Sequence, residues 1–354
     1  MLMLSYTALA CNLLSALFAL FLLARNRSTS PFNIGTLLFL IIIASMSFIS
    51  GNDWKHGLYL FLTVFAYITF FYYYQNQYKL LVVTVLAVLS LGVYVQLFQC
   101  IMHPEMWMIE DIKNDEGYIL GGGNYNTIGP RILLALSLAV ISRKYNKCLG
   151  VNTVLLFIAS IAILFMVKSM TSLTCIVLFT LICLIPTTRL KKQAVILILI
   201  GVILFQFLVC FSGKDFENNH LANWFIVDIL GKDMTFTGRT ELWDASLNKI
   251  VESPLFGYGF VDRNWYYSNI SHRTIGSHNF ILNLMIYGGI TSLIIYLFCA
   301  VKGILRIFRL NNSNAIYLLV AFSILNIMML FESYEIAVVL LFLTFMIYFP
   351  DGQF

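Results

Sequence analysis

Residues 238–243 read GRTELW, residues 254–259 read PLFGYG and residues 277–282 read SHNFIL, followed by a glycine pair at 288–289. This stretch gathers polar, aromatic and turn residues between two long hydrophobic runs. Almost all of the remaining chain is apolar, as membrane-spanning segments are. A membrane protein that keeps arginine, histidine and aspartate side chains in one large loop is expected to carry out its chemistry there.

The composition of the chain excludes a soluble domain with a large core. Of the 354 residues, 60% are hydrophobic and 11% are charged, whereas soluble domains carry about 25% charged residues. The sequence therefore predicts an all-α, polytopic membrane protein. We expect no separate cleavable signal peptide, because the first apolar run is long enough to span a membrane and has no basic start.

Eleven apolar stretches approach the length of about 20 residues that a membrane-spanning helix needs. They cover residues 2–24, 31–50, 57–74, 79–101, 125–142, 149–167, 169–187, 194–212, 279–301, 315–331 and 334–350. The stretch 125–142 contains Arg131 and begins in a glycine run, so we expect about eleven transmembrane helices within a range of ten to twelve.

Basic residues in the short loops predict the orientation of the chain. Lysines and arginines follow every second candidate span, and the alternate loops hold nearly all of the acids. This pattern places the N-terminus and the loop 213–278 outside and the C-terminus inside. The chain then divides into a transmembrane bundle of about eight helices at 1–212, the large outer loop at 213–278, and a bundle of about three helices at 279–354.

The large loop is predicted to contain an amphipathic helix at 239–252. One side of this helix carries Leu242, Trp243, Leu247, Ile250 and Val251. Thr237 is the expected N-cap, Pro254 ends the helix, and Gly257 and Gly259 mark a tight turn. Such a helix lies flat on the membrane or roofs a cavity.

Cationic side chains gather on the predicted outer face. They are Arg239, Arg263, Arg273 and His278, together with Arg131 and Lys168 at the ends of candidate spans. Arginine binds phosphate through two parallel hydrogen bonds, and histidine can accept a proton from a hydroxyl. This set suits a reaction in which a lipid-linked phosphate or pyrophosphate leaves. The alternative for each residue is an ordinary place at the membrane interface.

Other chemistries have no support in the sequence. There is no Walker motif, no Rossmann glycine pattern, no HExxH and no CxxC pair. These absences speak against ATP-driven transport, a nucleotide cofactor and zinc chemistry. We therefore expect no metal and no cofactor.

The order and spacing of the motifs resemble the O-antigen ligase and polymerase superfamily. Gly-Arg-x-x-x-Trp, Pro-Leu-x-Gly-x-Gly and His-Asn-x-x-Leu with a following glycine pair occur in that order within 238–289. The resemblance implies a GT-C-like fold and transfer of a glycan from undecaprenyl pyrophosphate to a hydroxyl outside the bacterial cytoplasmic (inner) membrane. It also implies that Arg239 and His278 are the functional positions. One departure is Lys168, which stands where family members often carry the arginine of a Ser-Arg pair, and lysine is not equivalent to arginine.

The interpretation is a metal-independent polymerase of O-antigen or capsular polysaccharide. His278 acts as general base or orients the acceptor, and Arg239 binds the pyrophosphate. The remaining predicted binding residues are Arg131, Lys168, Arg263, Arg273, Trp243, Tyr258 and Asn279.

Two alternatives stay open. An O-antigen ligase would transfer the glycan to lipid A-core, and a flippase would move lipid-linked sugars, although the chain shows no inverted repeat. The expected partners are an undecaprenyl-pyrophosphate-linked oligosaccharide and membrane lipid. A chain-length regulator and a flippase of the same pathway are further partners, and no nucleic acid is expected.

Overall fold

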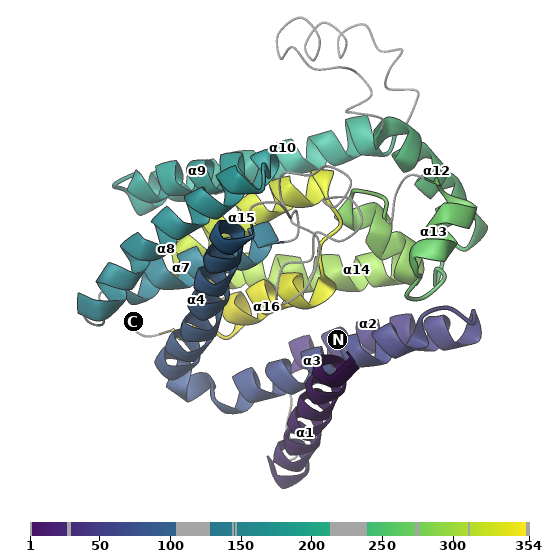
Figure 1. The fold of residues 1–354 in the computed structure, drawn as a ribbon, viewed down its shortest axis with the longest axis horizontal. Helices are drawn as coiled ribbons and strands as arrows, with labels where there is room; N and C mark the ends of the chain where they lie inside the picture. The colour runs from purple at the N-terminus through teal and green to yellow at the C-terminus, as the bar shows by residue number, and fades with distance from the viewer. Residues whose placement is uncertain are drawn as a thin grey trace, which may run out of the picture. The chain divides into compact units, whose positions relative to one another are not determined.

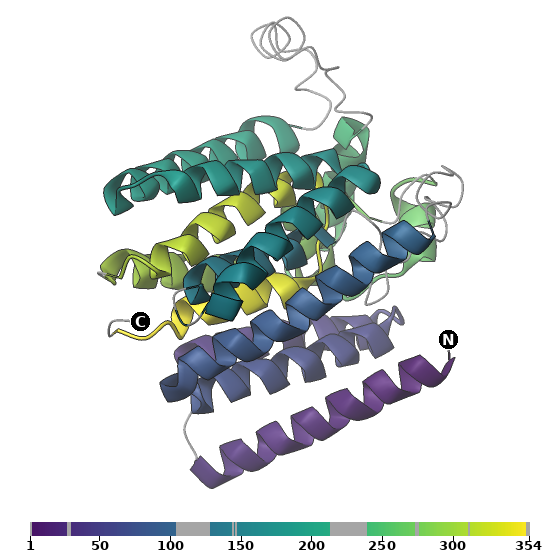
Figure 2. The ribbon, with the colours of Figure 1, turned by 60° about the vertical axis from the view of Figure 1, so that its left-hand side comes forward.

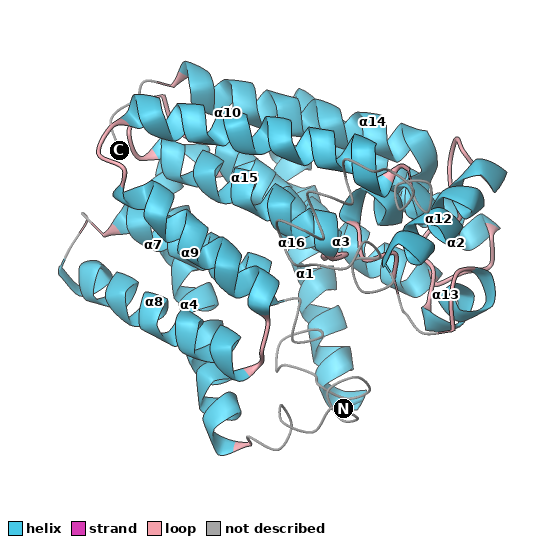
Figure 3. Cartoon of the chain, turned by 90° about the horizontal axis from the view of Figure 1, so that it is seen from above, coloured by secondary structure: helices cyan, strands magenta, loops and turns pink. Residues whose placement is uncertain are grey.

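The computed structural model describes residues 2–26, 30–103, 128–143, 145, 147–212, 239–272, 276–310 and 312–351. Throughout these ranges every regular element is a helix and none is a strand (Figure 3), so the predicted all-α class is confirmed. Thr237, Gly238 and Arg273 lie outside the described residues, as does the glycine run before Arg131.

Each of the eleven predicted stretches contains a helix (Figure 1). The helices are α1 (Leu2–Asn26), α2 (Pro31–Ile49), α3 (Trp54–Tyr73), α4 (Tyr78–Met102), α7 (Ile128–Ser142), α8 (Lys147–Met166), α9 (Met170–Leu184), α10 (Thr188–Phe205), α14 (Phe280–Arg309), α15 (Ala315–Phe331) and α16 (Ile336–Ile347). The shorter elements are a 3-10 turn (Gln75–Gln77), a π-helical segment (Gln206–Cys210), α12 (Arg239–Glu252) and α13 (Arg263–Asn269).

Six of the described helices are long and apolar enough to cross a membrane by length and composition. They are α2, α3, α4 with the turn before it, α8, α10 with its π-helical end, and α14. The other five are shorter apolar helices, with α1 counted over Ala10–Arg25. The total of eleven spans therefore stays a prediction, and so does the likeness to the GT-C fold.

The chain folds as two compact units that alternate along the sequence. The first comprises Met1–Phe70, Leu199–Val301 and Met329–Ser333, and the second comprises Phe71–Ile198, Lys302–Met328 and Tyr334–Phe354. The predicted three-part division follows spans and loops along the chain, and it stays a prediction. Arg239 and His278 belong to the first unit, and Arg131 and Lys168 belong to the second.

Within the first unit, the N-terminal helices pack through small residues. Ala16 and Ala19 of α1 are buried against Phe65 of α3, and Figure 2 shows these purple helices side by side. Small side chains let helices approach closely where lipid gives no hydrophobic drive for association.

The second unit is built around α7. Every residue of α7 apart from Arg131 is buried, as expected for a helix that is apolar on all sides. Helices α4, α8, α9 and α16 pack against it. Arg131 therefore projects from the least exposed helix of this unit.

Helix α14 is interrupted at the predicted glycine pair, which lies in the first unit. Gly288 has φ −140° and ψ 17°, and Gly289 has φ 60° and ψ −163°. The interruption removes the two helical hydrogen bonds that would cross the pair. Backbone groups freed in this way must find other partners when a helix lies in a membrane.

The turn that follows α12, residues 254–259, supplies those partners. Four backbone hydrogen bonds join it to α14: Tyr258 N–H to the Ile286 carbonyl (2.8 Å), Gly259 N–H to the Tyr287 carbonyl (2.9 Å), Ile290 N–H to the Pro254 carbonyl (2.8 Å) and Thr291 N–H to the Leu255 carbonyl (3.3 Å). The glycines permit this approach, because a Cβ on Gly257 would lie 2.8 Å from the Gly288 nitrogen. The predicted tight turn is confirmed, and it forms one unit with the glycine pair.

The bounds of the predicted amphipathic helix are confirmed, and its buried face is the predicted one in part, because Trp243 and Ile250 of the predicted apolar side are buried. The buried residues of α12 are Thr240, Trp243, Ser246 and Ile250. Val251, which was expected on the apolar side, is 76% exposed. Ser246 can be buried because its hydroxyl donates a hydrogen bond to the Leu242 carbonyl at 2.7 Å. The apolar pattern missed Thr240 and Ser246 because it gives no weight to small polar residues.

We predict that Gly289→Ala separates the 254–259 turn from α14. A side chain at this positive φ costs about 1–3 kcal/mol, and its Cβ would lie 2.6 Å from the Phe256 nitrogen. The melting temperature of the purified protein in detergent should fall by several degrees. The matched control is Gly92→Ala, because a Cβ on Gly92 of α4 has no neighbour within 4 Å. Equal melting temperatures for the two variants would contradict the role of the glycine pair.

Candidate functional site

Residues 330–333, at the end of α15 and just after it, connect the predicted catalytic residues. Four side chains contact this segment in order, three of them from the consecutive residues 277–279 and the fourth from Arg239. Asn279 Nδ2 donates to the Leu330 carbonyl (3.2 Å), Arg239 Nη1 donates to the Phe331 carbonyl, His278 Nδ1 lies 2.9 Å from Glu332 Oε1, and Ser277 Oγ lies 3.5 Å from Ser333 Oγ. The structure thus brings Arg239 and His278 to neighbouring residues of one segment in the first unit.

His278 is held in an uncommon backbone conformation beside a carboxylate. Its φ is 48°, a value that a non-glycine residue adopts at a cost and mainly where the surrounding structure requires it. The side chains of His278 and Glu332 are 30% and 14% exposed. An ionised carboxylate only accepts hydrogen bonds, so it places the imidazole proton on Nδ1. Nε2 then carries the lone pair that a general base needs.

Asn279 fixes the position of His278 from inside the protein. Its side chain is fully buried and its Oδ1 accepts from the Leu282 amide at 3.0 Å, which caps α14. Its Nδ2 donates to Gln206 Oε1 at 2.9 Å and to Cys210 Sγ at 3.4 Å. These contacts indicate a positioning role, and the predicted contact between Asn279 and substrate stays a prediction.

The partners of Asn279 come from the π-helical segment Gln206–Cys210, which ends α10. Its first and last residues both reach the amide of Asn279. Short π-helical segments are rare and occur frequently at functional sites. The apolar run at 194–212 gave no sign of this feature, because its composition is that of an ordinary span.

Arg239 is the first residue of α12, and aromatic residues hold it in place. Its guanidinium lies 5.9 Å from the ring centroid of Phe331, within cation–π range. Phe331 packs on Phe205 at 5.3 Å, and Phe205 packs edge-on against Trp243 at 6.5 Å. Trp243 therefore anchors the first turns of α12 beneath the arginine, in keeping with its predicted role in shaping the loop.

Tyr258 and Arg263, two further predicted binding residues, contact α12 and α13. The Tyr258 hydroxyl donates to the Lys249 carbonyl at 2.9 Å. Partial burial, together with the carboxylate of Glu252, raises the pKa of Tyr258, so this phenol stays protonated as a donor. Arg263 Nε donates to the Tyr267 hydroxyl at 2.6 Å, with the guanidinium over the Tyr267 ring. Substrate binding by Tyr258 and Arg263 stays a prediction.

The second unit holds Arg131 and Lys168. Both contacts of Arg131 to Glu335 come from Nη2, at 2.7 Å to Oε1 and 2.8 Å to Oε2. Lys168 is exposed, has φ 54°, and lies in the turn between α8 and α9. Among the described residues, Lys168 and His278 are the non-glycine positions with positive φ. Strained positions of this kind concentrate at functional sites, so Lys168 stays a candidate.

Sequence reasoning assigned no role to Glu332 and Glu335 and counted them only among the acids of a predicted outer loop. The structure pairs each of them with a predicted site cation, His278 and Arg131 respectively. A signal was present, because a charged side chain next to an apolar span normally requires a partner. Two carboxylates in one short loop were the available partners.

The described residues contain no group of three or more His, Cys, Asp or Glu side chains placed to hold a metal ion. At the 330–333 segment, the carboxylate of Glu332 is paired with His278 instead. Arg239 and His278 are two basic side chains that contact this segment.

A family profile described as O-antigen ligase matches residues 153–297. This stretch contains Lys168, Arg239, the 254–259 turn, His278 and the glycine pair, and it leaves out Arg131. The expected relationship to the O-antigen ligase and polymerase superfamily is thereby confirmed. No curated protein and no solved structure matches the chain significantly.

We predict that Asn279→Ala destabilises the protein through the loss of the cap and the amide contacts. A buried hydrogen bond whose partner is left unsatisfied costs about 1–3 kcal/mol, and here the partners include Gln206 and the Leu330 carbonyl. Thermal unfolding in detergent measures the effect. The control is Asn248→Ala on the exposed face of α12. A melting temperature for Asn279→Ala as high as that of this control would disprove the positioning role.

Proposed function

Because residues 153–297 carry the O-antigen ligase domain, we propose that this integral membrane protein is a polymerase of O-antigen or capsular polysaccharide. The donor is a glycan on undecaprenyl pyrophosphate, and the acceptor is the terminal sugar hydroxyl of another lipid-linked repeat unit. Catalysis takes place at the outer face of the bacterial cytoplasmic membrane. The observation that supports this most directly is the joining of Arg239 and His278 through residues 330–333.

His278 is proposed to remove the proton from the acceptor hydroxyl. Nε2 accepts the proton while the hydroxyl oxygen forms a bond to the anomeric carbon of the donor. The bond from that carbon to the pyrophosphate oxygen breaks, and its electron pair leaves with undecaprenyl pyrophosphate. Glu332, 2.9 Å from Nδ1, stabilises the imidazolium that forms and holds the ring in orientation.

Arg239 is proposed to stabilise the negative charge that develops on the leaving pyrophosphate. Its described partners are a backbone carbonyl and an aromatic ring, neither of which neutralises its charge. It stands at the first residue of α12, and His278 precedes the cap of α14, so two helix N-termini flank the pair. Helix N-termini favour anions through their exposed N–H groups and dipoles.

An O-antigen ligase is the second candidate, and the description of the matched family favours it. Ligase and polymerase share the donor half of the reaction, so the proposed roles of Arg239 and His278 hold for both. They differ in the acceptor, which is lipid A-core for the ligase. A chain-length regulator and a flippase of the same pathway are the proposed protein partners.

We predict that His278→Ala and Arg239→Ala abolish polymer formation. Each variant is returned to a strain that lacks the gene, and surface glycan is compared by gel after membrane levels are matched. Loss of the ladder with single repeats still on the acceptor indicates a polymerase. Long lipid-linked polymer with a bare acceptor indicates a ligase.

The matched controls for this experiment are exposed residues of the same types, His272→Ala and Arg309→Ala. Both should preserve the wild-type ladder. A normal ladder from either His278→Ala or Arg239→Ala at wild-type protein level would refute the proposed function.

We predict that Glu332→Gln slows transfer by about 10²-fold or more, because general-base catalysis is typically worth about 10²–10⁴-fold. The amide keeps the size of the side chain but removes the charge that stabilises protonated His278. The test measures kcat against pH with purified protein and lipid-linked repeats. If Glu332 acts through His278, the dependence of kcat on pH in Glu332→Gln should be shifted relative to the wild type. An unchanged pH dependence, with the same loss of rate at every pH, would contradict the pairing.

A further inference from the structure

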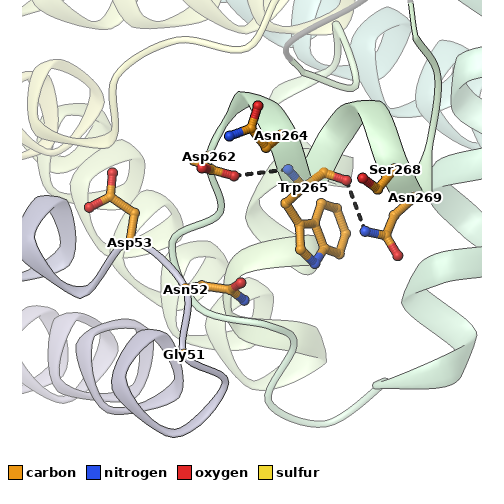
Figure 4. A pocket seen from close by; sticks show the side chains of 8 residues that line it. All are labelled: Gly51, Asn52, Asp53, Asp262, Asn264, Trp265, Ser268 and Asn269. Atoms are coloured by element: carbon orange, nitrogen blue, oxygen red, sulfur yellow. Dashed lines mark hydrogen bonds between the residues drawn. The ribbon is translucent and has the colours of Figure 1, made fainter.

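A polar pocket of about 510 Å³ lies in the first unit, between the turn joining α2 to α3 and helix α13. Figure 4 shows the side chains of both elements facing this space. Six of them give the pocket its chemistry: Asn52, Asp53, Asp262, Asn264, Trp265 and Asn269. No motif used to assign the function includes them, and they lie apart from the contacts of Arg239 and His278.

The pocket combines acceptors, amides and one large ring. Ionised carboxylates accept hydrogen bonds from hydroxyl groups, and amides both donate and accept. The indole of Trp265 offers a flat apolar face together with one N–H donor. A sugar ring presents the matching surfaces, with hydroxyls around its edge and C–H groups on its face.

The charges of the lining residues limit which ligands the pocket can bind. Two carboxylates, Asp53 and Asp262, line the pocket, and no arginine or lysine is among its described lining residues. A pyrophosphate would be repelled at short range by both of them. The pocket therefore suits an uncharged portion of a substrate, unlike the cationic surroundings of Arg239.

Hydrogen bonds hold the lining residues in place without a ligand. Asp262 accepts from the Trp265 amide at 2.8 Å, and Asn269 Nδ2 donates to the Trp265 carbonyl at 2.9 Å, as dashed lines in Figure 4 show. Asn52 Nδ2 donates to the Tyr258 carbonyl at 2.8 Å. A pocket fixed in this way loses little conformational freedom when it binds a ligand.

Contacts of the pocket residues also connect the pocket to the 254–259 turn and to α14, whose N-terminus follows His278. Tyr258 belongs to the 254–259 turn bound to α14, and its ring lies 5.0 Å from that of Trp265. Tyr266 of α13 hydrogen-bonds through its hydroxyl to Asn283. Asn283 lies one helical turn beyond Asn279, the cap that follows His278.

We propose that this pocket is a glycan subsite that binds an uncharged, hydroxyl-rich sugar ring of the lipid-linked oligosaccharide. The proposal rests on the proposed function for the identity of the glycan. The ring stacks on Trp265, and its hydroxyls donate to Asp53 and Asp262. The pocket selects the sugar portion of the substrate, while the cationic site handles the pyrophosphate.

The test measures binding rather than turnover. Full-length protein in lipid nanodiscs is titrated with the oligosaccharide released by mild acid from the host's own lipid-linked repeats, which has no pyrophosphate and cannot react. Binding is followed by saturation-transfer NMR. Wild-type protein should bind with a Kd of about 1 mM or tighter, and Trp265→Leu should weaken binding about tenfold or more.

Trp265→Leu could weaken binding by disturbing the fold, so two smaller changes in the pocket serve as further tests. Asn264→Ala removes an exposed amide, and Asp53→Asn keeps the shape of the side chain. Each should weaken binding severalfold at an unchanged melting temperature. The matched control is Trp54→Leu, an exposed tryptophan next to Asp53 that does not line the pocket, and it should bind as the wild type does.

Two results would overturn the subsite. One is the absence of a binding signal up to about 10 mM glycan, well above a millimolar Kd. The other is equal binding by wild type and all three pocket variants. The outcome is separable from that of the proposed function. If His278→Ala and Arg239→Ala still make polymer while the pocket variants lose binding, the catalytic assignment fails and the glycan site stands.

Discussion

The fold of the first unit depends on how the backbone of α14 is satisfied at Gly288 and Gly289. A membrane-spanning helix cannot leave carbonyls and amides without partners, so a break is stable only if another segment completes its hydrogen bonds. The 254–259 turn does so with two donors and two acceptors. That exchange joins the turn after α12 to α14 through backbone groups. The joint therefore does not depend on which side chains the turn carries, apart from the glycines that permit the close approach.

The second constraint is the density of contacts at residues 330–333. A buried asparagine caps α14 and binds the π-helical end of α10, so the residue before it has little freedom. His278 adopts a positive φ at this place, and its side chain contacts the carboxylate of Glu332. Strain of this kind persists only where the surroundings determine it fully. The packing around Asn279 therefore fixes the backbone next to His278, and Glu332 contacts the imidazole ring itself.

The sequence predicted features that depend on local patterns. Apolar runs placed the long helices, and the bounds of α12 followed from Pro254 and the apolar spacing around Trp243. Pairings between distant residues could not be predicted in this way. Nothing in the composition of residues 254–259 says that their partners lie at a glycine pair in the next span. Glu332 is 54 residues from His278 along the chain, and the π-helical turn has the composition of an ordinary helix. The burial of Thr240 and Ser246 on α12 was missed because an apolar pattern gives no weight to small polar residues, and Ser246 can be buried because its hydroxyl donates to the Leu242 carbonyl.

The existing partners of each predicted arginine affect how well it could bind an anionic substrate. Arg131 already contacts both carboxylate oxygens of Glu335. Pyrophosphate could bind there only by replacing that carboxylate. Arg263 rests on a neutral phenol at the surface of α13, where water screens its charge. Arg239 contacts a carbonyl and a ring on a partly buried helix end, where a charge acts more strongly than in water. A new anion that binds to an arginine already in an ion pair must displace the existing carboxylate. Its net binding free energy is therefore reduced by the energy of the ion pair that is lost. By this reasoning Arg239 has the most to gain from pyrophosphate, whereas Arg131 would contribute only if Glu335 moved away.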